Sequence, residues 1–160
     1  MINEIKLSQY YSEIANKLDE IIPIEWETIV MYAEELSDVS SASFYFYAKE
    51  GNEIYYSGNI PEDFSVSREI FKRILRELRE IIRRLWNEFV SSEEEKWSTL
   101  TFVLQEDWKF KAKFGYDLDT KVGSFERKVI SAYNELGLLP KGEFAKEILK
   151  EYLNKQKEEL

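Results

Sequence analysis

The chain has 160 residues, enough for a domain with a sizeable hydrophobic core, and it contains neither cysteine nor histidine. These two absences exclude disulfides, thiolate metal sites and every catalytic pair built on histidine, so they argue against an enzyme. The net charge of −9 disfavours binding to nucleic acids and membranes and favours a basic partner, although it would also serve simply to keep the protein soluble.

The first half of the chain predicts a helix followed by three strands. Apolar residues at helical spacing begin near Leu7, and the helix should end at Ile22 because Pro23 follows. Enrichment in aromatic and β-branched residues then predicts three strands, at 26–36, 43–49 and 53–57.

The middle of the chain predicts one long helix. A loop that begins at Ile60-Pro61 should end at Ser67, a residue well suited to cap a helix. The helix that follows has the strongest periodic pattern in the chain. Its expected apolar stripe consists of Ile70, Phe71, Ile74, Leu75, Leu78, Ile81, Ile82, Leu85 and Phe89.

Alternation with a period of two predicts an antiparallel hairpin after the long helix. Its first strand should place Leu100, Phe102 and Leu104 on one face, before a turn near residues 106–107. Its second strand should place Trp108, Phe110, Ala112, Phe114 and Tyr116 on one face and Lys109, Lys111 and Lys113 on the other. Two helices should complete the chain, one at 125–136 capped by Gly137 and one after Pro140 with Phe144, Ile148, Leu149 and Tyr152 on its apolar face.

The order of elements is therefore α-β-β-β-α-β-β-α-α. Because the strands form hairpins and the helices are segregated from them, we expect an α+β fold, with an antiparallel sheet of about five strands and helices packed on one face. We expect residues 1–160 to form a single domain, of which 140–160 is a C-terminal helical extension. The chain opens with mixed charge and has no apolar stretch long enough to span a bilayer, so we expect a cytoplasmic protein.

Three groups of side chains allow a functional reading beside a structural one. Asp117, Asp119 and Glu126 could hold a divalent metal, but their spacing matches no EF-hand, and a polar turn leading into a helix is favoured, with no metal or cofactor. Seven bases on the long helix could bind nucleic acid, yet pairs such as Glu69–Arg73 favour a solvated, internally paired face. Four tyrosines could be interface anchors or simply the second face of the sheet; these are Tyr45, Tyr47, Tyr55 and Tyr56.

An ordered set of short segments between about residues 10 and 140 resembles the YezG family, which includes the EsaG-type antitoxins. The segments are Ile14-Ala15-Asn16-Lys17-Leu18, Ile22-Pro23, Glu25-Trp26, Phe44-Tyr45-Phe46-Tyr47, Ile60-Pro61, Val66-Ser67, Ile70-Phe71, Trp97-Ser98-Thr99-Leu100-Thr101-Phe102, Lys109-Phe110, Phe114-Gly115-Tyr116, Glu126-Arg127, Tyr133, Leu136-Gly137-Leu138 and Pro140. The chain departs from the family's pattern at Asp107-Trp108, where a glycine usually precedes Lys-Phe, and at Ser131, where an aromatic residue is expected.

The resemblance implies a cytoplasmic antitoxin, or immunity protein, for an LXG-type toxin that Gram-positive bacteria secrete. The C-terminal domain of such a toxin is typically a nuclease, so we expect a non-enzymatic, stoichiometric inhibitor that masks this domain. A toxin-specific chaperone or adaptor, which would bind without inhibiting, is the main alternative; a metal-dependent hydrolase and a nucleic-acid binder are the others. The oligomeric state is open.

The candidate partner-binding residues come from an acidic run rather than from the resemblance. Between Glu13 and Asp38 eight carboxylates are opposed by Lys17 alone, which favours either a docking surface for a basic partner or a solvated face of a helix and a strand. We expect the partner to contact Glu25, Glu27, Glu34, Glu35 and Asp38.

Overall fold

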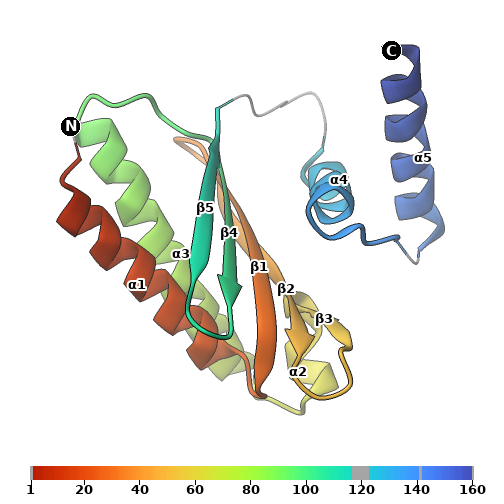
Figure 1. Ribbon diagram of the computed structural model, residues 1–160, viewed down its shortest axis with the longest axis horizontal. Coiled ribbons are helices and arrows are strands. Elements are labelled where there is room, and N and C mark those ends of the chain that lie inside the picture. Colours follow the sequence, from red (N-terminus) through yellow and green to blue (C-terminus); the bar gives the residue numbers. More distant parts are fainter. Residues whose placement is uncertain (1, 117–122, 141, 160) are drawn as a thin grey trace. The chain divides into compact units, whose positions relative to one another are not determined.

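A five-stranded antiparallel sheet organises most of the chain, with strand order β3-β2-β1-β4-β5 (Figure 1). The structure, a computed structural model, describes residues 2–116, 123–140 and 142–159. Its elements are α1 (Glu4–Ile21), β1 (Trp26–Glu35), β2 (Ser40–Ala48), β3 (Ile54–Tyr56), a short 3₁₀ turn (Ser57–Asn59), α2 (Ile60–Asp63), α3 (Arg68–Ser91), β4 (Thr99–Gln105), β5 (Phe110–Gly115), α4 (Ser124–Leu136) and α5 (Glu143–Glu158). The α+β fold and the order of its main elements are confirmed.

The chain divides into two compact units, residues 1–118 and 119–160. The first contains α1 to β5 and the second contains α4 and α5. Whether the whole chain behaves as a single domain stays a prediction. No helix in the described ranges combines the length and the apolar character needed to cross a membrane.

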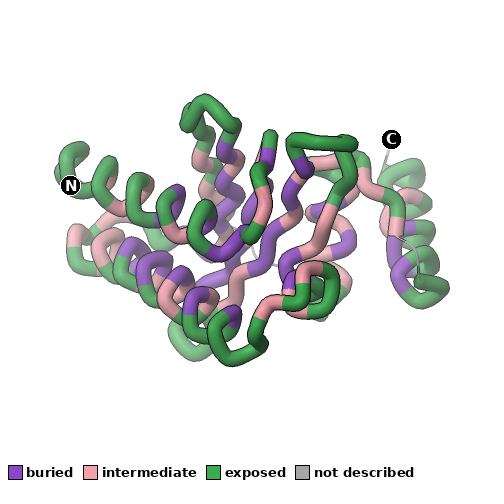
Figure 2. Tube along the Cα trace, turned by 90° about the horizontal axis from the view of Figure 1, so that it is seen from below, coloured by how far each residue is buried: buried purple, intermediate pink, exposed green. Residues whose placement is uncertain are grey.

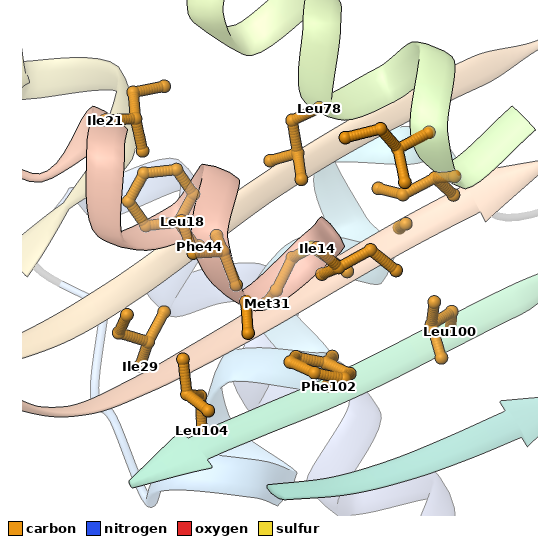
Figure 3. Packing of buried hydrophobic residues seen from close by; sticks show 14 of the residues in the cluster. Ile14, Leu18, Ile21, Ile29, Met31, Phe44, Leu78, Leu100, Phe102 and Leu104 are labelled. Atoms are coloured by element: carbon orange, nitrogen blue, oxygen red, sulfur yellow. The ribbon is translucent and has the colours of Figure 1, made fainter. Parts of the chain in front are cut away.

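The core of the first unit lies between one face of the sheet and the helices α1 and α3. Alternate residues of the strands point to this face. Leu100, Phe102 and Leu104 of β4 are buried there, as expected, and so is Phe44 of β2. Figure 2 shows buried positions along the strands, and Figure 3 shows how Ile14, Leu18 and Leu78 of the two helices meet Ile29 and Met31 of β1. Burial of this apolar face is the main stabilising term of the unit.

Local sequence signals end and begin the helices where they were expected. Ile22, followed by Pro23, adopts an extended conformation and ends α1. The hydroxyl oxygen of Ser67 accepts a hydrogen bond from the amide of Ile70 and caps α3. Gly137, with φ of 64°, ends α4, and its amide donates to the carbonyl of Tyr133 at 2.8 Å.

Three details of the sequence prediction are wrong. The segment that begins at Ile60 is not all loop, because Ile60–Asp63 forms the short helix α2, whose first residue is fully buried. Ile70 was expected on the apolar stripe of α3 but is half exposed, whereas Trp86 is buried. Phe144 was expected on the apolar face of α5 but is largely exposed.

The second unit is a pair of helices that pack through a small apolar cluster. Val129 of α4 lies against Ala145, Ile148 and Leu149 of α5, with Tyr133, Tyr152 and Leu153 partly buried around them. The side-chain amide of Asn134 donates to the hydroxyl of Tyr152 at 3.1 Å, so an exposed hydrogen bond also joins the two helices.

Candidate partner-binding surface

The structure does not gather the five predicted acidic residues onto one surface. Glu25 and Glu27 are exposed where β1 begins, and Asp38 is exposed in the turn where β1 has ended. A strand of ten residues spans about 30 Å, at about 3.3 Å per residue, so the two groups lie at opposite ends of the sheet. Between them, Glu34 and Glu35 are buried.

Glu35 is held inside the protein by a network that fixes the β1–β2 turn. Its carboxylate lies 2.8 Å from Nη1 of Arg83 and accepts a hydrogen bond from the hydroxyl of Ser40 at 2.6 Å. Arg83 also donates to the carbonyl oxygens of Leu36 and Ser37 in the turn. Burial raises the pKa of the Glu35 carboxyl above its ordinary value, while the hydrogen bonds from Ser40 and Arg83 oppose that change. This carboxylate is thus engaged in structure and is not presented to solvent.

Glu34 points to the opposite face of the sheet from Glu35, since neighbouring residues of a strand alternate. One of its carboxylate oxygens accepts a hydrogen bond from the hydroxyl of Tyr32 at 2.7 Å. Whether Glu34, Glu35 or Asp38 influences partner binding stays a prediction.

Exposed carboxylates from several segments gather instead where β1 begins, and we call this surface the acidic end. Its members are Asp19, Glu20, Glu25, Glu27, Glu50, Glu53, Glu106 and Asp107, all exposed. They come from the last turn of α1, the start of β1, the β2–β3 turn and the β4–β5 turn, which meet at the lower end of the sheet in Figure 1. Three lysines lie among them, namely Lys17, Lys49 and Lys109, so carboxylates predominate.

Contacts across the acidic end hold its segments together. The backbone amide of Lys49 donates to the carbonyl of Glu25 at 3.1 Å, and its ammonium lies 3.9 Å from the carboxylate of Glu106. The indole of Trp26 donates to Asp19 at 2.9 Å and thereby ties β1 to α1. Glu27 is exposed because the register shifts between its two neighbours on β1, as at a β-bulge.

Trp108 stands in the turn between β4 and β5, beside these carboxylates. Its φ of 68° lies in the left-handed region, which is unfavourable for a bulky residue and natural for glycine. The amide of Trp108 donates to the carbonyl of Gln105, and its ring meets Trp26 edge-on with centroids 6.1 Å apart. The turn expected near residues 106–107 is therefore confirmed. It extends to Trp108, which was expected on the second strand of the hairpin and instead presents a half-exposed indole before β5 begins.

Sequence comparison assigns the chain to a family. Residues 7–150 match the family described as immunity protein YezG-like, so the match includes most of each unit. The chain belongs to the YezG-like family of immunity proteins. It is 39% identical to the immunity protein YezG of Bacillus subtilis (strain 168) over 149 residues, which is 92% of this chain and 99% of that protein.

Two further relatives cover nearly the whole chain. The immunity protein YezG of Bacillus spizizenii is 37% identical over 150 residues, with 92% of this chain and 93% of the relative covered. The type VII secretion system protein EsaG of Staphylococcus aureus is 29% identical over 147 residues, with 90% of each chain covered. The resemblance to the YezG family, EsaG included, is thus confirmed.

The sequence also raised the possibilities of a metal site at residues 117–126 and of a nucleic-acid surface on α3. Within residues 2–116, 123–140 and 142–159, no three acidic side chains are grouped to hold a metal ion; Asp117 and Asp119 lie outside the described residues, and Glu126 is in the first turn of α4. On α3, Arg73 pairs with Glu77 and not with Glu69 as expected. Further bases of that helix pair outside it, Arg68 with Glu62, Arg83 with Glu35 and Arg84 with Glu13.

The four tyrosines considered as interface anchors divide between the two faces of the sheet. Tyr55 stacks on Phe46 with centroids 5.4 Å apart and belongs to the helix-covered face. Tyr45 and Tyr56 contact each other on the other face, with centroids 5.1 Å apart. Tyr47, next to Phe46 on the strand, also points to that second face. None of the four is fully exposed.

Proposed function

We propose that this YezG-like chain is a cytoplasmic, non-enzymatic antitoxin that binds the nuclease domain of a cognate secreted toxin and so protects the producing cell. The acidic end carries this proposal. A nuclease grips phosphate with a basic surface, and a surface rich in carboxylates, such as that formed by Glu25, Glu27, Glu50 and Glu106, is complementary to it. Family membership supports the immunity role. The relative EsaG is described as a type VII secretion system protein, which supports a secreted toxin, of the LXG type, as the target.

The mechanism that we propose is occlusion. An inhibitor whose carboxylates occupy the phosphate-binding surface prevents DNA from reaching the nuclease active site, and it needs no catalytic group of its own. Opposite charges also speed the encounter of the two proteins, so a newly made toxin is captured before it reaches DNA. Glu25 and Glu27 remain in this proposal as predicted contacts. Glu35 instead holds the β1–β2 turn.

Co-expression with the toxin encoded beside this chain's gene tests the proposal. The complex is purified, its mass is measured, and cleavage of plasmid DNA is compared with that by the free C-terminal domain of the toxin. We expect a stable complex that leaves the plasmid intact. A stable complex that still cuts DNA would instead identify a chaperone or adaptor, and the absence of any complex would remove the antitoxin role for this toxin.

A further inference from the structure

The outer edge of β5 has backbone groups without a strand to pair with. In the described part of the chain, β5 is the last strand of the sheet and pairs with β4 alone. The amide of Gln105 donates to the carbonyl of Lys109 at 2.9 Å, which makes this pair a hydrogen-bonded one. Because such pairs alternate along antiparallel strands, the amides and carbonyls of Phe110, Ala112 and Phe114 point away from β4, toward the open edge.

Exposed aromatic side chains lie near the two ends of the same strand. Trp108 is 45% exposed, Phe110 is 42% exposed and Tyr116, just after the strand, is 45% exposed. Tyr11 of α1 lies behind this row, with its ring centroid 5.1 Å from that of Phe110. Trp108 turns toward Trp26 of β1, on the far side of β4, so the exposed ring at the open edge itself is that of Phe110. An exposed aromatic ring beside unpaired backbone groups is suited to contact with a partner.

Charged side chains mark the other face of β5. Lys109 and Lys111 are exposed there and alternate with the aromatic residues. If two copies of this chain paired through β5 about Ala112, Lys111 of each copy would lie opposite Lys113 of the other. Like charges directly opposite each other destabilise a strand pair, and edge lysines are a common protection against self-association. The edge therefore favours a different chain over a second copy.

We propose that the open edge of β5 accepts an extended segment of the cognate toxin as a sixth strand. The segment places apolar side chains beside Phe110 and acidic side chains beside Lys111. Backbone hydrogen bonds to Phe110, Ala112 and Phe114 supply affinity, and the side chains on the two faces supply specificity. This inference rests on the proposed function, because it names where and how the same partner binds. In this arrangement the acidic end raises the rate of association, and the edge of β5 slows dissociation.

Amide hydrogen exchange, resolved by residue with NMR, tests the pairing in the wild-type protein. In the free chain the amides of Phe110, Ala112 and Phe114 should exchange rapidly, while those of Lys111 and Lys113 are already slow through pairing with β4. Adding the C-terminal domain of the toxin, with its nuclease inactivated, should slow exchange of the three outward amides at least tenfold. Unchanged rates in a stable complex, together with inhibition of the active toxin domain in the plasmid assay, would overturn the edge proposal and leave the antitoxin role standing. Failure to form the complex would remove both.

A pair of substitutions at one position separates the backbone from the side chain. Ala112→Pro removes an outward amide and leaves the β4 ladder intact, whereas Ala112→Val adds similar bulk and keeps the amide. We expect the proline variant to bind the toxin domain at least tenfold more weakly and the valine variant to stay within about threefold of wild type, with both melting cooperatively. Equal loss in the two variants would contradict strand pairing. If Ala112→Pro does not fold, the exchange measurement on the wild type tests the strand pairing by itself. Slow exchange of the three outward amides in a dimer of the free protein would contradict the proposal and show that two copies pair with each other.

Discussion

The guanidinium of Arg83 joins a buried carboxylate to the turn that follows it. It pairs with Glu35, donates to two carbonyl oxygens of the turn and lies over the ring of Trp86, 4.4 Å from its centroid. The indole of Trp86 in turn donates to the carbonyl of Trp97 at 2.9 Å. Arg83 thus joins α3 to the β1–β2 turn and packs on Trp86, which holds the segment before β4. We therefore expect its removal to lower the stability of the protein rather than to remove a contact with the partner.

Arg83→Met should lower the free energy of unfolding by about 2–3 kcal/mol, because it leaves the carboxylate of Glu35 buried without its cation. The cost falls below the roughly 3–5 kcal/mol of a fully buried pair, since Arg83 is partly exposed. Urea denaturation measures the change. Arg76→Met, on an exposed position of the same helix, should change stability by no more than about 0.5 kcal/mol. Adding Glu35→Gln to Arg83→Met should recover part of the loss, and a failure to do so would contradict the buried-charge explanation.

At the scale of elements, α1 and α3 are joined by apolar packing and by a row of ion pairs. Lys6 pairs with Glu88, Glu13 with Arg84 and Lys17 with Glu77, so the contacts run in opposite directions along the two helices. The pairs are mostly exposed and contribute little individually. The buried residues between the helices supply most of the stability of this contact.

The pair between Lys17 and Glu77 makes a small part of the stability depend on pH. The hydrogen bond from Lys17 is the main cause that holds the pKa of Glu77 below its ordinary value. The folded protein therefore releases this proton more readily than the unfolded chain. The stability that follows is complete above the ordinary carboxyl pKa of about 4.5 and is lost as pH falls through the folded value.

Lys17→Met should raise the pKa of Glu77 toward its ordinary value, as measured by NMR titration of the side-chain carboxyl. The difference in unfolding midpoint between wild type and this variant should be present at pH 7 and shrink below about pH 4.5. Lys17 also pairs with Glu20, so Glu20→Gln serves as the control that leaves the α1–α3 contact in place. A Glu77 pKa that does not respond to Lys17→Met would show that another group sets it.

At the scale of the molecule, charge is distributed unevenly over the first unit. The acidic end brings together carboxylates from four separate segments, while the bases of α3 are partly used in ion pairs with acids elsewhere. Such a distribution mainly raises the association rate constant for a basic partner, and salt weakens the effect by screening the charges.

Reversing charge at the acidic end should therefore slow association with the toxin domain. We expect Glu25→Lys with Glu27→Lys to lower the association rate constant about tenfold at low ionic strength and to flatten its dependence on salt, as measured by stopped-flow fluorescence. Glu4→Lys with Glu95→Lys makes the same change in net charge on exposed residues away from the acidic end, and should slow association far less. Equal slowing by both pairs would show that net charge alone matters.

The sequence by itself determined the elements and the fold class, because their signals are local. Proline after Ile22, the cap at Ser67 and glycine at residue 137 act on their own backbone, and alternation along β4 directly selects the residues that face the core. The lack of histidine and cysteine likewise limits the chemistry without any knowledge of the fold. The family could also be recognised from short segments in their order along the chain.

Only the tertiary structure decided which charges share a surface. Acidic residues that are neighbours in sequence, such as Glu25 and Glu35, are separated by the length of a strand, and one of them is buried with Arg83. Antiparallel pairing brings Glu25 instead toward Glu106, more than eighty residues away in the chain, through Lys49. Burial and charge clustering depend on which strands and helices become neighbours. Long-range pairing and packing determine these neighbours, and a local pattern of residues contains no information about them.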